Sequence, residues 1–281
     1  MKLLTILGAR PQFIKAATVS RSIKARDDID EVIVHTGQHF DANMSDIFFD
    51  QLNIPSPHHN LQIAGLSHGA MTGRMLEDIE IVIQEEEPDW ILVYGDTNST
   101  LAGALCAAKL HIPVAHVEAG LRSHNVLMPE EVNRVLTDRI SSLLLCPTQT
   151  AVSNLRDEGF PFSAMGENRT SAMQSIVNVG DVMFDAVLYY RHRAREQVSL
   201  DVFGLSHQDY ALCTLHRQEN TDDPRRLNNI LSGLREIAKD LQVVLPLHPR
   251  TKRKIEQQNR ADALKGLKIL EPQPYIEMQR L

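Results

Sequence analysis

The side chains of this sequence that could do chemistry lie where short apolar runs end. Most of these runs are followed by small residues and then by a charged or polar group. The groups in these positions are Arg10, Lys15, Gln38, His39, Asp96, Glu118, His216, Arg217, Glu219, Asn220, His248 and Arg250. Carboxylates and histidines transfer protons, whereas arginine and lysine bind phosphate oxygens. The combination predicts a site for an anionic ligand whose reaction needs proton transfer.

Several of the acidic residues also have a purely structural interpretation. Asp96 lies just before a predicted helix and is suited to cap it. Glu118 is suited to pair with Arg122 on a loop. Glu130 and Glu131 occupy a predicted first helical turn, where the helix dipole favours acids. The functional interpretation gains weight because so many titratable groups are expected at one place.

The elements that must position these groups alternate along the chain. The expected strands are residues 2–7, 31–35, 90–94, 113–117, 142–146, 176–179, 210–215, 242–247 and 267–270. The expected helices start at Pro11 and cover residues 75–86, 98–109, 129–141, 149–158, 182–195, 224–239 and 250–259. This alternation predicts an α/β fold with parallel sheets covered on both faces.

The alternating pattern weakens between residues 160 and 175, where Gly, Ser, Asn and Pro collect. We therefore expect two doubly wound, Rossmann-like units, residues 1–172 and 173–281. Ligands of such sheets bind at the carboxyl ends of the strands. The polar groups that follow the strands are thus expected to converge on one cleft.

Composition excludes several classes of protein. With 29 Lys and Arg against 36 Asp and Glu, the net charge of −7 argues against a general nucleic-acid partner. The apolar run at residues 2–7 is too short for a signal peptide, and no run approaches a membrane span. The sequence predicts a soluble cytoplasmic protein with no membrane partner. Cys106, Cys146 and Cys213 lie in separate apolar runs and are expected to be free thiols.

The sequence has no motif for a common cofactor. It contains neither a Walker-type nor a G-x-G-x-x-G pattern, and no Asp/Asn ladder suggests a metal. His111 and His116 flank a predicted strand at a spacing that does not suit zinc. We expect no metal site and no cofactor.

Seven segments, in order along the chain, carry the chemistry-bearing residues. They are GARPQFIK (8–15), TGQH (36–39), VYGDT (93–97), HVEAGLR (116–122), PEEVNR (129–134), LHRQEN (215–220) and HP (248–249). Together they resemble the motifs of the non-hydrolysing UDP-N-acetylglucosamine 2-epimerases. The resemblance covers essentially the whole chain.

The resemblance implies a glycosyltransferase-B-like pair of Rossmann-type domains. The family inverts C2 of a UDP-linked 2-acetamido sugar without NAD, by eliminating UDP to a 2-acetamidoglucal and adding it back on the other face. The residues that match the family's catalytic groups are Lys15, Asp96, Glu118, Glu130 and His216. Glu131 is the adjacent alternative to Glu130. Residues expected to bind the UDP-sugar are Arg10, Arg217, Glu219, Asn220 and His248.

Some members of the family bind a second UDP-sugar as an activator. The matching positions are Gln38, His39, Arg74, Arg217 and His248, although Phe40 and Asp41 depart from the usual polar pattern. The main expected substrate is UDP-N-acetylglucosamine. The GARPQFIK form is similar to a branch that includes UDP-2,3-diacetamido-2,3-dideoxyglucuronate 2-epimerases of O-antigen synthesis, which is the alternative.

The resemblance also bears on the chain's length and assembly. The sequence ends at residues 274–281, where a helix is expected to begin, whereas family members continue further. This predicts a second domain that is cut short, in a homodimeric enzyme. Three other functions stay open: a glycosyltransferase of the same fold, a hydrolysing epimerase, and a truncated, non-catalytic UDP-sugar-binding protein.

Overall fold

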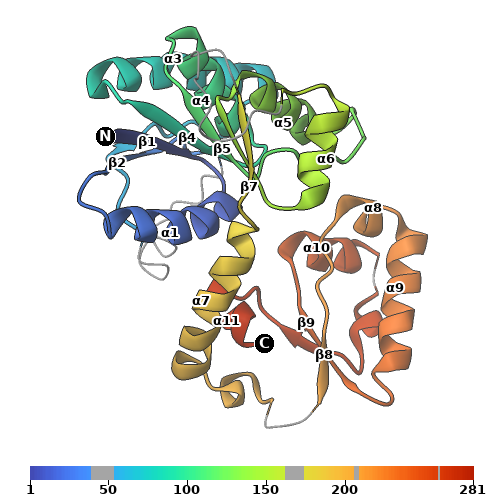
Figure 1. The fold of residues 1–281 in the computed structure, drawn as a ribbon. Coiled ribbons are helices and arrows are strands. Elements are labelled where there is room, and N and C mark those ends of the chain that lie inside the picture. Colours follow the sequence, from blue (N-terminus) through green and yellow to red (C-terminus); the bar gives the residue numbers. More distant parts are fainter. Residues whose placement is uncertain (39–53, 162–173, 206–208, 259) are drawn as a thin grey trace. The chain divides into compact units, whose positions relative to one another are not determined.

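The computed structural model describes residues 1–38, 54–161, 174–205, 209–258 and 260–281. The chain divides into two compact units, unit 1 (Met1–Ala186) and unit 2 (Val187–Leu281). Figure 1 labels most of their helices and strands. Each unit is built on a sheet, and all strand pairings among the described residues are parallel.

Unit 1 contains a seven-stranded sheet in the order β3-β2-β1-β4-β5-β6-β7. The strands are β1 (Lys2–Leu7), β2 (Asp30–His35), β3 (His59–Asn60), β4 (Trp90–Tyr94), β5 (Val114–Val117), β6 (Leu143–Cys146) and β7 (Ser175–Asn178). The helices are α1 (Arg10–Lys24), α3 (His68–Glu86), α4 (Asn98–Lys109), α5 (Pro129–Ile140) and α6 (Gln149–Asp157), with α7 (Val182–Gln197) crossing into unit 2. No helix in the described part of the chain is long and apolar enough to cross a bilayer.

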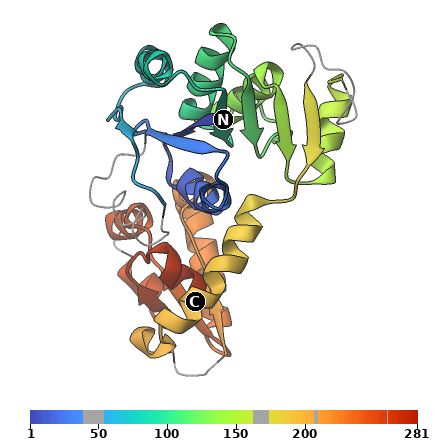
Figure 2. The same cartoon turned by 60° about the vertical axis from the view of Figure 1, so that its left-hand side comes forward.

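Alternation along the strands of unit 1 separates two faces of the sheet. Leu4 points into a buried apolar cluster that includes Ile79 of α3. On the other face, the hydroxyls of Thr5 and of Ser20 in α1 both donate to the carboxylate of Glu31, at 2.6 and 3.0 Å. Helices α1 and α3 therefore cover opposite faces, as Figure 1 and Figure 2 both show.

The strand order of unit 1 reverses between β1 and β4. From β1 the chain passes to β2 on one side, and the strands from β4 onward build the other side. Gly8 stands at this point: a Cβ there would lie 2.0 Å from Ser99 Oγ and 2.3 Å from Thr36 Oγ1. The turn after β1, the end of β2 and the start of α4 thus meet with no room for a side chain. In doubly wound sheets such a switch point is where ligands bind.

Unit 2 contains a three-stranded sheet in the order β10-β9-β8. Its strands are β8 (Tyr210–Leu212), β9 (Gln242–Pro246) and β10 (Lys268–Leu270). Its helices are α8 (Gln218–Thr221), α9 (Pro224–Ile237), α10 (Pro249–Gln257) and α11 (Tyr275–Arg280), with short 3-10 turns at Leu200–Phe203 and Ala261–Leu264. Leu227, Leu231, Leu245 and Ile255 form the centre of its core.

Most predicted strands and helices are confirmed to within a few residues, but one strand joins a different sheet. The strand predicted at residues 176–179 was expected to open the second unit. It is β7, which pairs with β6 in unit 1, and the compact units divide after Ala186. An apolar run shows that a segment is a strand, whereas its partner is fixed by tertiary packing. The segment around residue 172, where the boundary was predicted, lies outside the described residues.

Candidate active site

The carboxyl ends of the neighbouring strands β4 and β5 bring two predicted acids together with two cations. Glu118, directly after β5, forms an ion pair with Lys15 of α1, and the two side chains are 20% and 11% exposed. Asp96, two residues after β4, forms an ion pair with Arg134 of α5. Lys15, Asp96 and Glu118 thus occupy the position that the sequence predicts, at the switch point of the sheet. Arg134 is an addition that the sequence analysis missed.

Backbone conformation shapes this end of β4 and β5. Gly95 adopts φ = 64°, and a Cβ there would lie 3.2 Å from Glu118 Oε2 and 3.7 Å from Lys15 Nζ. Glu118 itself has φ = 72°, a left-handed conformation that costs energy for a residue with a side chain. Such outliers are often found at functional sites, where the surrounding structure holds them in place.

The structure decides between the alternatives for Asp96 and Glu118. The residue that caps α4 is Thr97, whose hydroxyl accepts a hydrogen bond from the Thr100 amide at 3.2 Å. Asp96 is therefore not needed as a cap. The partner of Glu118 is Lys15, whereas Arg122 pairs with other carboxylates. The structural interpretation of Asp96 as the helix cap was therefore wrong, and so was that of Glu118 as the partner of Arg122.

The two glutamates at the start of α5 have different surroundings. Glu131 is 4% exposed, accepts hydrogen bonds from the amides of Ser123 and His124 at 2.9–3.1 Å, and pairs with Arg134 at 2.7 Å. Burial alone would raise the pKa of Glu131, but these donors and the guanidinium outweigh it and hold the pKa below its usual value. Glu130 is exposed. Glu131 therefore anchors the preceding loop, and Glu130 is the glutamate that is open to solvent.

Gln12 connects the end of β1 to the end of β4. Its side-chain oxygen accepts from the amides of Gly8 and Ala9 at 2.7 and 2.9 Å, and its amide nitrogen donates to the Tyr94 carbonyl at 2.7 Å. Gln12 is 2% exposed. This single buried side chain fixes the turn before Arg10 against the strand that leads to Asp96.

Other predicted residues of unit 1 lie near or apart from this cluster. Arg10 begins α1 directly after the turn that follows β1, and partial burial lowers the pKa of its guanidinium. Gln38 accepts from the amide and the hydroxyl of Ser99 at 3.0 and 2.7 Å, at the start of α4. Arg74 is exposed on α3 and pairs with Glu77 at 3.3 Å. His39 lies outside the described residues.

The predicted residues of unit 2 gather at the carboxyl ends of β8 and β9. His216 and Arg217 are exposed in the loop after β8, and His248 is the exposed N-cap of α10 after β9. The His216 and His248 rings are 6.1 Å apart between centroids. Glu219 and Asn220 lie in the short helix α8. Their convergence with the residues of unit 1 on one cleft remains a prediction.

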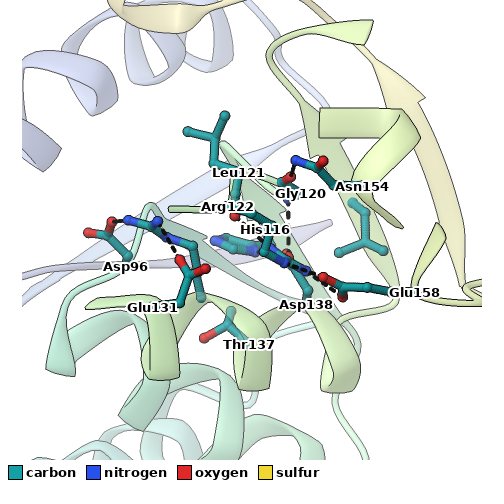
Figure 3. Close-up of polar contacts among 12 residues, drawn as sticks. Asp96, His116, Gly120, Leu121, Arg122, Glu131, Thr137, Asp138, Asn154 and Glu158 are labelled. Atoms are coloured by element: carbon teal, nitrogen blue, oxygen red, sulfur yellow. Dashed lines mark hydrogen bonds and ion pairs between the residues drawn. The ribbon is translucent and has the colours of Figure 1, made fainter. Parts of the chain in front are cut away.

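A network that the sequence did not reveal lies at the ends of β4 and β5 (Figure 3), and all of its side chains are buried except that of Glu158, which is 31% exposed. It contains His116 of β5, Asp138 of α5, Arg122 and Glu158. The sequence pattern around His116 bears only on metal binding, and Asp138 has the ordinary position of a polar residue on a helix. No group of three His, Cys, Asp or Glu suited to a metal occurs in residues 1–38, 54–161, 174–205, 209–258 and 260–281.

Comparison with known proteins places this arrangement in a family. A sequence profile of the UDP-N-acetylglucosamine 2-epimerases matches residues 21–281. The chain belongs to the UDP-N-acetylglucosamine 2-epimerase family. The resemblance inferred from the seven motifs is thereby confirmed, and with it membership of a class of isomerases.

Relatives of this epimerase-family chain carry two different names. It is 55% identical over 280 residues to the UDP-2,3-diacetamido-2,3-dideoxy-D-glucuronate 2-epimerase of Pseudomonas aeruginosa, covering 99% of this chain and 74% of that one. It is 46% identical over 289 residues to the UDP-N-acetylglucosamine 2-epimerase of Methanocaldococcus jannaschii, covering 100% and 76%. Both names agree with the substrates expected from the sequence.

Solved structures share the fold of this epimerase-family chain. The M. jannaschii enzyme in complex with UDP-GlcNAc and UDP matches with a TM-score of 0.82 and 45% identity, over 99% of this chain and 75% of that one. The Neisseria meningitidis enzyme bound to UDP-GlcNAc matches with a TM-score of 0.83 and 28% identity, over 99% and 74%. The predicted α/β fold with parallel sheets is confirmed.

Proposed function

We propose that this chain interconverts UDP-N-acetylglucosamine and UDP-N-acetylmannosamine by inverting C2 of the sugar. The observation that carries the proposal is the pair of carboxylate–cation contacts at the ends of β4 and β5, Lys15 with Glu118 and Arg134 with Asp96. Inversion needs groups that remove a proton from C2 and return it on the other face. Two acids held by separate cations at one sheet edge suit that task.

The proposed reaction breaks and remakes two bonds. In elimination, the C1–O bond to UDP breaks with its electron pair leaving on the diphosphate, while a carboxylate takes the C2 proton, and a 2-acetamidoglucal remains. In addition, a proton is delivered to the other face of C2, and a diphosphate oxygen of UDP bonds to C1. The sum is an isomerisation with no change in oxidation state. Anionic groups near C1 stabilise the cationic character that develops as the C1–O bond lengthens.

Each residue of the cluster has a proposed part in this reaction. Glu118 and Asp96 exchange the C2 proton, with Glu130 as the third acid, and Lys15 and Arg134 hold the first two in fixed orientations. In unit 2, His216 and Arg217 bind the diphosphate. This assignment is supported by their exposure at a strand end and by the ability of a guanidinium to form paired hydrogen bonds with phosphate oxygens.

The second candidate substrate is UDP-2,3-diacetamido-2,3-dideoxyglucuronate, because a relative of that name is 55% identical to this chain. This sugar has an additional acetamido group at C3 and a carboxylate at C6. Measuring kcat/KM with both UDP-sugars separates the two candidates. At least tenfold preference for one of them, about 1.4 kcal/mol in transition-state binding, would identify the substrate.

A single incubation distinguishes this proposal from its rivals. With UDP-N-acetylglucosamine in deuterated water, we expect UDP-N-acetylmannosamine that carries deuterium at C2, and we expect Asp96→Asn to slow its formation about 10²-fold or more. Free N-acetylmannosamine with UDP would indicate a hydrolysing epimerase, and transfer to an added acceptor would indicate a glycosyltransferase. Thermal stabilisation by either candidate UDP-sugar without turnover of either one would indicate a binding protein.

We also propose a homodimer that works in the cytoplasm. Exposed apolar side chains on and before α5, Leu127, Val132 and Leu136, support an interface between copies. The first apolar run is the buried strand β1, which gives that segment a place in the sheet. Light scattering of the purified protein tests the first point, and fractionation of expressing cells tests the second.

A further inference from the structure

The buried network at the ends of β4 and β5 contains a histidine with two close partners. His116 and Asp138 are both 0% exposed. His116 Nδ1 lies 2.7 Å from Asp138 Oδ1, and His116 Nε2 lies 2.7 Å from the carbonyl oxygen of Gly95. Figure 3 labels His116 and Asp138 among the side chains of this network.

Both atoms that face the ring are hydrogen-bond acceptors. A carboxylate and a backbone carbonyl have no hydrogen to donate, so both contacts are hydrogen bonds only when both ring nitrogens carry hydrogen. Arg122, whose side chain is 2% exposed, pairs with both Asp138 and Glu158. Such pairing is favourable because a buried charge without a partner is costly.

Asp138 extends the network to the loop that follows β5. Its second oxygen accepts from the Gly120 amide at 3.1 Å and from Arg122 Nη1 at 2.7 Å. Arg122 is in turn held by Glu158 at 2.6 and 2.9 Å. The carbonyl of Gly120 accepts from Asn154 at 2.9 Å. The amide and the carbonyl of Gly120 are thus both hydrogen-bonded, and the loop after β5 is fixed at this residue.

We propose that the His116–Asp138 pair is a positioning device for the two proposed catalytic acids, an inference that rests on the proposed function. Its contacts join the backbone just before Asp96 to the backbone just after Glu118. The two loops therefore keep one fixed relation, which sets where both carboxylates stand relative to C1 and C2 of the sugar. Neither His116 nor Asp138 is proposed to touch substrate, because both are fully buried.

Two substitutions at His116 test this device. The amide nitrogen of Asn in His116→Asn can take the place of Nδ1, so the contact with Asp138 is kept and the contact with Gly95 is lost. We expect kcat to fall about 10- to 100-fold while KM for the UDP-sugar stays within about threefold, because small displacements of positioned groups are costly. The amide nitrogen of Gln in His116→Gln can reach the place of Nε2, and this variant should recover part of kcat.

Two control variants separate positioning from loss of stability. Thr137→Val alters a buried side chain next to Asp138 on α5 and should leave kcat unchanged. Ile79→Ala opens a cavity in the core under α3, lowers the unfolding temperature, and should also leave kcat unchanged. A kcat of His116→Asn within about twofold of wild type, or a rise in KM alone, overturns the positioning role.

A measurement on the wild-type protein tests the device without using activity. In ¹⁵N NMR of histidine-labelled protein, both ring nitrogens of His116 should show a directly bonded hydrogen if both contacts are hydrogen bonds. A ring with one bare nitrogen would overturn the inference, even if the His116 variants fail to fold. If the wild-type chain epimerises neither UDP-sugar, the proposed function fails, whereas the NMR result still tests the two hydrogen bonds.

Discussion

The strand ends of unit 1 and of unit 2 both carry predicted site residues, but these residues differ in burial and pairing. In unit 1, Lys15 and Glu118 are mostly buried and are bonded to each other. In unit 2, His216, Arg217 and His248 are exposed. One sheet edge is held by contacts within the protein, and the other presents cationic and polar groups to solvent.

This difference suggests how the two units divide the work. Groups that must stand at a set distance from reacting atoms benefit from being fixed before the substrate arrives. Groups that hold a diphosphate can remain hydrated until the anion replaces the water. Substitutions in unit 1 should therefore change the rate or the stability, and substitutions in unit 2 should change mainly binding.

The largest expected effect is on the rate, at the Lys15–Glu118 pair. Lys15→Met and Glu118→Gln should each lower kcat about 10²- to 10⁴-fold, the range of general acid–base catalysis. The kcat of the double variant should lie within a few-fold of the kcat of the less active single variant. Two groups that act as a unit lose their joint contribution when either one is removed, so removing the second adds little. Initial rates of epimerisation measure all three.

A second ion pair in unit 1 provides the matched control. Lys2 and Glu86 form a pair of 3.0 Å between β1 and α3, with side chains 34% and 22% exposed. Lys2→Met with Glu86→Gln should leave kcat unchanged, because this pair lies at the amino end of β1. Losses that multiply in the Lys15 and Glu118 double variant would show that the two groups act independently, and the contrast between the units would weaken.

The next effect concerns binding by unit 2. Arg217→Ala should weaken UDP binding about 10- to 100-fold, since a hydrogen bond to a charged group contributes about 1.5–3 kcal/mol. The unfolding temperature without ligand should not change, because Arg217 is exposed. Calorimetric titration with UDP measures the first effect. Arg235→Ala, in the last turn of α9, is the control and should bind UDP normally.

The bounds of the helices and strands that carry the site residues were predicted from the sequence better than the partners of those residues. Helix α4 was predicted at its observed bounds, because polar capping residues precede a run with helical spacing. Strand β1 was likewise predicted at its observed bounds. These features depend on a few neighbouring residues. Lys15, Asp96 and Glu118 were selected because strand ends of a parallel sheet share one edge.

What the sequence did not reveal depends on partners far along the chain. Glu118 was paired with the nearby Arg122, whereas its partner Lys15 lies 103 residues away. His116 and Asp138 lie on different elements, and nothing in their local sequence marks them as a pair. His59 of β3 contacts Glu86, 27 residues away at the end of α3, at 2.7 Å. Long-range pairing is set by how the layers pack, which residue spacing does not encode.

A smaller effect is expected on stability at the switch point of unit 1. Gly8→Ala would place a Cβ 2.0 Å from Ser99 Oγ, so buried side chains must move. The free energy of unfolding should fall by about 1–3 kcal/mol, as in other overpacked sites. Gly73→Ala, in α3 with no atom within 4 Å, should instead stabilise by about 0.5–1 kcal/mol. Equal urea midpoints for the two variants would contradict the close approach of Ser99 and Thr36 to Gly8.

The smallest expected effect is on the pH dependence of stability, at Glu131. Its pKa is lowered in the folded state, so the folded protein binds this proton less readily than the unfolded chain. The stabilisation it provides is complete above its ordinary pKa of 4.5 and is lost as the pH falls through the lower folded value. The difference in unfolding free energy between wild type and Glu131→Gln should be constant from pH 6 to 8 and shrink below about pH 4.5.

Glu31 gives the same experiment with the opposite sign. Burial raises its pKa, although the hydroxyls of Thr5 and Ser20 oppose the shift. The folded state therefore binds this proton more readily than the unfolded chain, and wild type should gain stability relative to Glu31→Gln as the pH falls through the raised pKa. Urea unfolding from pH 8 down to about pH 3 measures both variants. If the stability difference from wild type changed with pH in the same direction for both variants, the hydrogen bonds and the guanidinium around Glu131 would not outweigh its burial.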